Sequence, residues 1–183
     1  MRQDDDYTDY DLTSMVAKPL YFGMLINIVL PGALLFVCYY IEQRTYMENR
    51  IPDSTDFVVI LFAALSLVQA GLALWLRNKW FNEPMVRRMV TFEKDVQREL
   101  VARSRPIFLL IASISLWGFI LFFLVAQFEF ALAFALVSFV TFQVVRPRYG
   151  SVRKLLAHQK KLAEQGQFVQ SGPEVSRREL DSD

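Results

Sequence analysis

Four stretches of the chain are apolar over a length that can cross a bilayer. The longest run extends from Pro106 to Val145, and Gln127 and Glu129 are its main interruptions. A helix of this length would measure roughly 60 Å, about twice the hydrocarbon thickness of a bilayer, so the run must fold back on itself. It predicts two antiparallel spans that turn near residues 127–129.

Two earlier apolar stretches bring the number of predicted spans to four. The fold class predicted from this pattern is an all-α integral membrane protein, with its four transmembrane helices arranged as two hairpins. The spans lie within a membrane domain over residues 19–145, at about 20–41, 57–76, 106–126 and 129–145.

The net charge of +1 becomes informative when the charges are placed along the chain. Of the twenty Lys and Arg residues, Arg44 and Arg50 lie between the first two spans, and the other eighteen lie before the first span, between the second and third, or after the fourth. By the positive-inside rule, both termini and the central loop face the cytoplasm. We expect a bacterial cytoplasmic membrane in preference to a eukaryotic one.

Two amphipathic helices are predicted on the cytoplasmic side. The first, at about 84–104, begins at Asn82-Glu83-Pro84, is separated from the third span by Pro106, and has one apolar face formed by Met85, Met89, Phe92, Val96 and Leu100. The second, within residues 146–166, is capped by Ser151 and has a stripe formed by Val152, Leu155, Leu156, Gln159, Leu162 and Ala163.

The two ends of the chain are polar. Residues 1–18 are acidic and lack apolar periodicity, so we expect a cytoplasmic arm in which a short helix could begin near Asp11 to Ser14. Residues 167–183 are polar and are predicted to be disordered.

A layer of polar side chains is predicted within the spans. Asn27, Gln69, Ser113 and Ser138 each lie seven residues from the cytoplasmic end of their span, or roughly 10 Å deep. Pro31 adds to this layer because its ring displaces the carbonyl of Asn27. We interpret the layer as interhelical hydrogen bonding in preference to a substrate or ion site or to chance placement.

Small residues and phenylalanines suggest how the spans meet. Ala63, Ser66, Ala70 and Ala73 form one small-residue seam, and Ala131, Ala135 and Ser138 form another. Nine phenylalanines fall between Pro106 and Val145, which is more than one internal seam holds. We therefore expect some of them to face lipid or a partner subunit.

The basic residues of the cytoplasmic helices are candidates for contacts with the membrane surface or with a partner. An apolar stripe packed on its own neighbour, with solvated charge outside it, is the alternative. Basic residues interleaved with acids beside a bilayer argue against nucleic-acid binding. The candidate contact residues are Arg87, Arg88, Arg98, Arg153, Lys154, Lys160 and Lys161.

Several classes of chemistry lack support in the sequence. The central turns of the spans carry no Asp, Glu, Lys, Arg or His, which argues against an ion-coupled transporter or proton pump. His158 is the sole histidine and is expected at a solvated position of the last helix, so no metal or cofactor is expected. No phosphate-binding glycine loop or nucleophile motif occurs, and we expect no catalytic residue and no enzyme activity.

The leading hypothesis is a non-catalytic accessory, scaffold or assembly subunit of a larger membrane protein complex. Its expected partners are membrane lipids and other membrane-protein subunits or further copies of the chain. One alternative is a small oligomeric channel or carrier lined by Asn27 and Gln69. A further alternative is a lipid-binding or membrane-shaping protein whose basic helices press on the inner leaflet.

Overall fold

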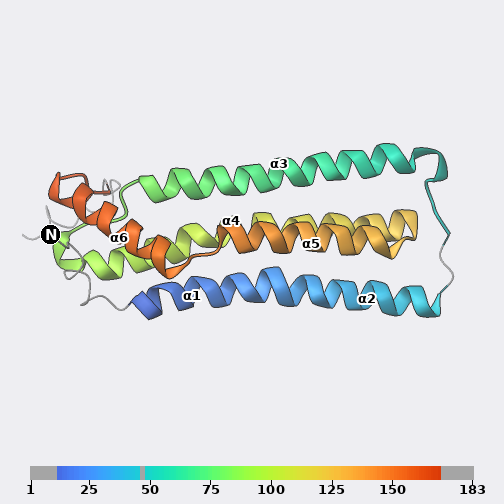
Figure 1. Ribbon diagram of the computed structural model, residues 1–183, viewed down its shortest axis with the longest axis horizontal. Helices are drawn as coiled ribbons and strands as arrows, with labels where there is room; N and C mark the ends of the chain where they lie inside the picture. Colours follow the sequence, from blue (N-terminus) through green and yellow to red (C-terminus); the bar gives the residue numbers. More distant parts are fainter. Residues whose placement is uncertain (1–11, 46–47, 170–183) are drawn as a thin grey trace, which may run out of the picture.

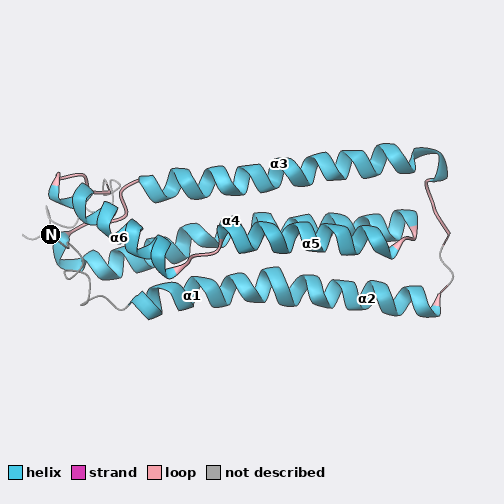
Figure 2. Ribbon diagram, in the orientation of Figure 1, coloured by secondary structure: helices cyan, strands magenta, loops and turns pink. Residues whose placement is uncertain are grey.

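A computed structural model of the chain describes residues 12–45 and 48–169, and these residues form helices and connecting segments without a strand (Figure 2). Four helical segments are long and apolar enough to cross a membrane: Leu12–Arg44, Pro52–Asn82, Met89–Val125 and Phe128–Val145. The predicted all-helical membrane class with four spans is therefore supported.

Each spanning segment consists of one or more regular elements. The first is continuous through α1, a π-helical turn η1 and α2, and short 3-10 turns precede α3 and α4. The element bounds are α1 Leu12–Met24, η1 Leu25–Val29, α2 Leu30–Arg44, η2 Pro52–Ser54, α3 Thr55–Asn82, η3 Met89–Thr91, α4 Phe92–Val125, α5 Phe128–Val145 and α6 Tyr149–Glu164.

The spanning helices lie in three layers (Figure 1). Helices α4 and α5 form the middle layer, α3 lies on one side of them, and the α1–α2 segment lies on the other. The first and second spans therefore flank the α4–α5 pair and do not pack together as the expected first hairpin. The chain crosses between them over the far end of the pair, where Arg50 donates a backbone hydrogen bond to the Leu124 carbonyl at 2.9 Å.

The α4–α5 pair is built on very close backbone approach. Ala126 and Gln127 separate the two helices, and Ala126 takes a left-handed conformation with φ 59°. A Cβ atom at Gly118 would lie 2.6 Å from Phe134 Cβ and 3.2 Å from the Ala131 backbone. Gly118 thus lets α5 lie directly against α4, where the predicted seam of Ala131, Ala135 and Ser138 is buried.

Helix α3 packs on α4 along its own seam of small residues. Ser66 and Ala73 are its buried residues, and Ala63 and Ala70 are partly buried beside them. The rings of Phe62 and Trp117 stack with their centroids 5.1 Å apart. Ser66 and Ala73, with Ala63 and Ala70 beside them, therefore form the packed side of α3, and Ala64 and Gly71 lie on its exposed side.

The first span meets the central pair at two phenylalanines. A Cβ atom at Gly23 would lie 2.7 Å from Phe142 and 2.9 Å from Phe108, whose rings pack edge to face. Two residues after Gly23 the helix widens to π geometry over Leu25–Val29, and this wider turn ends two residues before Pro31. Because a proline lacks an N–H and its ring crowds the preceding turn, this wider turn accommodates Pro31 within a continuous helix.

At one end of the bundle, parts of four segments form a small unit that we call the head. It consists of the first turns of α1, residues 83–91, the first turns of α4, and α6 (Figure 1). Its apolar core contains Met15, Val16, Met85, Val86, Phe92, Val96, Leu100, Val152, Leu155 and Leu156. Residues of both predicted apolar stripes therefore share one core with α1, which contacts both α4 and α6.

The start of α4 differs from the helix predicted at 84–104. Residues 83–88 form no helix, α4 begins at Phe92, and Met89 is exposed instead of buried. Glu83 is extended, as a residue before proline tends to be, and Met85 is instead inserted in the head core. Helix α4 then continues through Pro106 without a break, because packing on both sides of the proline outweighs one lost hydrogen bond.

The polar ends predicted at 1–18 and 167–183 are shorter in the structure. Residues 12–18 are the first turns of α1, and Met15 and Val16 are buried in the head. Val169 donates a backbone hydrogen bond to the Val86 carbonyl at 2.9 Å, so residues 167–169 are ordered against the head. The rest of both predicted segments, residues 1–11 and 170–183, lies outside the described residues.

Candidate functional site

Arg103 joins the end of α3 to the beginning of α4. Its guanidinium donates to the Trp80 carbonyl at 2.7 Å and to the Pro84 carbonyl at 3.0 Å. The same group lies 3.4 Å from a carboxylate oxygen of Glu99 and 3.6 Å from one of Glu83. Because the last carbonyls of a helix lack partners and carry partial negative charge, Arg103 stabilises the end of α3 and orients residues 83–91.

Gln159 joins α6 to the same connecting segment. Its side-chain oxygen accepts the Met85 N–H at 2.8 Å, and its amide nitrogen donates to the Glu83 carbonyl at 3.0 Å and the Phe81 carbonyl at 3.4 Å. The residue is almost completely buried. A fully hydrogen-bonded amide in an apolar core fixes one register, so Gln159 positions α6 on the head.

Asp95 organises the first turn of α4. Its carboxylate accepts the Arg87 N–H at 3.0 Å and the Thr91 hydroxyl at 2.8 Å. Partial burial acts to raise the pKa of Asp95, but these hydrogen bonds, another from the Arg88 backbone and the nearby Arg87 charge outweigh it and lower the pKa below its usual range. The ionised carboxylate therefore stabilises the folded head.

Replacing Asp95 with asparagine should weaken the pH dependence of stability. A folded-state pKa below the unfolded value stabilises the protein above about pH 4, and this contribution is lost as the pH falls through the folded-state pKa. We expect Asp95→Asn to be less stable than the wild type at pH 7 and to lose less stability below pH 4. Thermal unfolding in detergent at several pH values measures this, and parallel losses in both proteins would contradict it.

The structure places two of the four predicted layer residues in interhelical hydrogen bonds. The Trp117 indole on α4 donates to the Gln69 side-chain oxygen on α3 at 3.0 Å. The Ser138 hydroxyl on α5 donates to the Ile111 carbonyl on α4 at 3.0 Å and is fully buried. Each of these bonds joins a different pair of helices.

Asn27 and Ser113 bond within their own helices. Asn27 donates to the Gly23 carbonyl at 3.1 Å, and its buried side-chain oxygen has no hydrogen-bond partner among the described residues. Ser113 donates to the Leu110 carbonyl at 2.7 Å. These hydrogen bonds join none of the four side chains to another, and Asn27 and Gln69 belong to helices on opposite sides of the α4–α5 pair (Figure 1).

Within residues 12–45 and 48–169, no group of three or more His, Cys, Asp and Glu side chains is arranged to hold a metal ion. His158, expected at a solvated position, is partly buried, and its Nε2 atom is buried without a hydrogen-bond partner among the described residues.

No protein-family model, curated protein or solved structure matches this chain. The side chains of the head and of the spans are thus the basis for any functional proposal.

The seven predicted basic contact residues are spread over the head. Arg87 lies 3.8 Å from a carboxylate oxygen of Glu99, and Arg88 is exposed nearby. Arg153, Lys154, Lys160 and Lys161 lie on α6. Of the seven, Arg98 alone lines a basic pocket between α1 and α4.

A basic pocket of about 330 Å³ lies between the first turns of α1 and α4. It is lined by Lys18, Lys94, Gln97, Arg98, Val101, Ala102 and Arg105. Sequence reasoning missed Lys18, Lys94 and Arg105 as members of a site. Lys94, Arg98 and Arg105 are spaced for one helical face, which the sequence could have shown, but Lys18 comes from a distant helix that only the folded chain brings there.

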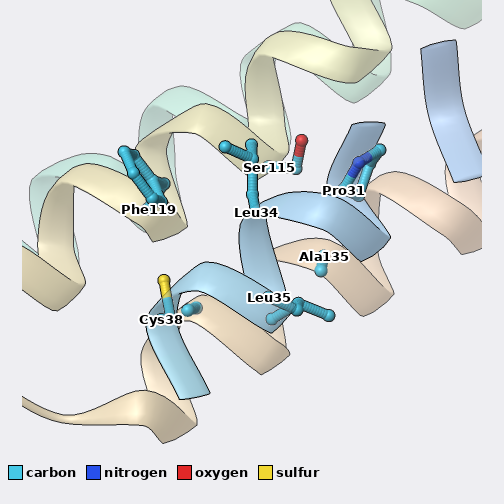
Figure 3. A pocket seen from close by; sticks show the side chains of 8 residues that line it. Pro31, Leu34, Leu35, Cys38, Ser115, Phe119 and Ala135 are labelled. Atoms are coloured by element: carbon cyan, nitrogen blue, oxygen red, sulfur yellow. The ribbon is translucent and has the colours of Figure 1, made fainter. Parts of the chain in front are cut away.

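A second cavity lies between α2, α4 and α5 (Figure 3). Its volume is about 10 Å³, which is room for a single water molecule. Its lining is mainly apolar, and Ser115 donates its hydroxyl to the Ala112 carbonyl of its own helix. This cavity is therefore a small packing gap, and its lining residues are Pro31, Leu34, Leu35, Cys38, Ser115, Phe119, Ala131 and Ala135.

Proposed function

We propose that the chain is a non-catalytic accessory or assembly subunit of a larger membrane protein complex, with its head in the cytoplasm. The observation that carries this proposal is the open face of α3, which we define by Ala64, Val68, Gly71 and Trp75. These four residues are exposed, and a Cβ atom at Gly71 would touch nothing within 4 Å. The head's orientation is supported by the eighteen Lys and Arg residues outside the loop between the first two spans.

The residues of the open face alternate between small and large at steps of four, three and four. Small residues on a membrane helix permit another helix to approach closely, and the larger neighbours then pack along its sides. Gly71 lies at the centre of this face and leaves room for the backbone of another helix to come close. A partner helix fits this face for that reason.

The alternatives have weaker support in the fold. A channel lined by Asn27 and Gln69 requires a common path, but the helices bearing them lie on opposite sides of the α4–α5 pair. A helix that inserts its apolar stripe into a membrane surface requires a free stripe, but Val152, Leu155 and Leu156 of α6 are buried in the head.

Replacing Gly71 with leucine tests the proposal. The added side chain should block a partner helix at the open face while lipid adapts to it, so co-purification of the partner should fall about tenfold or more. The matched control is Ala133→Leu, which enlarges an exposed position on α5. Both proteins are expressed at native level and purified in mild detergent, and partner recovery is quantified by mass spectrometry. Equal recovery with both variants would contradict a partner at this face.

A further inference from the structure

The basic pocket lies where the spanning segments meet the head. Lys18 directly precedes Pro19 near the start of the first apolar stretch, and Arg105 directly precedes Pro106 at the start of the third. Both side chains are therefore at the depth of lipid headgroups when the spans cross a bilayer.

The lining of the pocket combines four cations with an amide and two apolar residues. As far as the described residues form it, this lining contains no carboxylate. Lys18 donates to the Gln97 side-chain oxygen at 3.5 Å, and Gln97 in turn donates to Ser14 at 3.0 Å. The Arg105 guanidinium lies over the Phe22 ring, 5.6 Å from its centroid. Lys18 and Arg105 are thus held at the pocket by uncharged neighbours, which do not neutralise their positive charges.

Like charges at this spacing oppose folding unless an anion lies among them. Lys94 and Arg98 are four residues apart on α4, where two cations repel each other. Arg105 lies on the same face, and Lys18 adds a fourth positive charge from α1. An anionic group in the pocket would convert this repulsion into attraction.

Exposed apolar side chains continue from the pocket into the spans. Leu109 lies one turn beyond Arg105 on α4, and Tyr21 on α1 and Leu25 at the start of η1 follow Lys18. A ligand with a charged head and hydrocarbon chains can therefore satisfy both surfaces together, with its phosphate among the cations and its chains along the spans. A free phosphate ion would contact the cations of the pocket and leave the apolar surface unused.

We propose that this pocket binds the phosphate headgroup of an anionic phospholipid from the leaflet on the head's side. The cations of the pocket would contact the phosphate, and the apolar surface below would contact the acyl chains. Basic pockets between membrane helices are suited to such headgroups, because each nearby Lys or Arg strengthens the attraction. This inference does not depend on a partner at the open face of α3.

Native mass spectrometry of the full chain in detergent micelles tests the proposal. The micelles contain dioleoylphosphatidylglycerol or dioleoylphosphatidylcholine, and the retained lipid is quantified. The pocket variant combines Lys94→Gln, Arg98→Gln and Arg105→Gln. The comparison variant removes the same charge outside the pocket through Arg88→Gln, Lys154→Gln and Lys161→Gln, and circular dichroism verifies that both fold.

We expect wild-type protein to retain phosphatidylglycerol in preference to phosphatidylcholine. The pocket variant should lose this retention by about tenfold or more, while the comparison variant should change by less than about twofold. Excess inorganic phosphate should fail to displace the lipid. Equal losses in the two variants would show attraction spread over the surface, and displacement by phosphate would show a simple anion site. Either result, or a wild type without preference, would overturn the proposal.

Discussion

Replacing Gly118 with valine is expected to cause a large loss of stability in the spans. A Cβ atom there would lie 2.6 Å from Phe134 Cβ and 3.2 Å from the Ala131 backbone, and neither neighbour is the flexible end of a side chain. The α4–α5 pair must therefore separate, at a cost of about 1–3 kcal/mol or more. The midpoint of unfolding in a sodium dodecyl sulfate titration measures this loss.

Gly71→Val is the matched control for Gly118→Val. Both positions are glycines within spanning helices, but a Cβ atom at Gly71 would meet no other part of the described chain within 4 Å. The isolated chain should therefore unfold at nearly the wild-type midpoint when Gly71 is replaced. If the two variants shift the midpoint equally, the close packing of α4 on α5 at Gly118 is wrong.

Replacing Arg103 with alanine is expected to detach residues 83–91 from the rest of the head. The change leaves the Trp80 and Pro84 carbonyls without their donor and the Glu83 and Glu99 carboxylates without their shared cation. Hydrogen bonds to a charged group contribute about 1.5–3 kcal/mol, so a loss of this size is expected. Unfolding in detergent and the rate of proteolytic cleavage within residues 83–91 measure the two effects.

Two further variants distinguish geometry from charge at this position. Arg103→Lys keeps the charge but loses the planar fork that reaches both carbonyls, so most of the stability should still be lost. Arg88→Ala removes an exposed cation from the same segment and should have little effect. Full stability of Arg103→Lys would show that charge alone matters, which contradicts the role given to the two carbonyls.

The spans could be predicted from the sequence because their signal depends on length and composition alone. Each apolar stretch must bury its backbone polar groups within a helix when it lies in lipid, whatever its neighbours are. The small residues Ser66, Ala73, Ala131 and Ser138 also proved to be buried, because a seam of small side chains is a property of one helix. Predictions confined to single helices were thus the most accurate ones.

The helix boundaries near the head could not be predicted in the same way. Pro84 and Pro106 are similar signals in the sequence, yet α4 starts eight residues after the first and continues through the second. Packing decides between them, since Met85 is inserted in the head core while Ile107 and Phe108 hold α4 against the other spans. Local propensity does not contain this information.

The arrangement of the spans and the members of the basic pocket also required the fold. Gly118 and Gly71 are both glycines within apolar stretches, but Gly118 meets α5 while Gly71 meets no neighbouring element among the described residues. Lys18 reaches a pocket formed mainly by residues about eighty positions away. Such long-range placement depends on which helices are neighbours, and hydropathy does not specify neighbours.

The most direct test of the proposed accessory role is the composition of the assembly that contains the chain in its native membrane. The chain is expressed at native level, extracted in mild detergent and purified, and its mass and constituent polypeptides are measured. An accessory subunit predicts a mass well above that of one chain, with a second membrane polypeptide in a fixed ratio. Recovery of this chain alone would contradict that role.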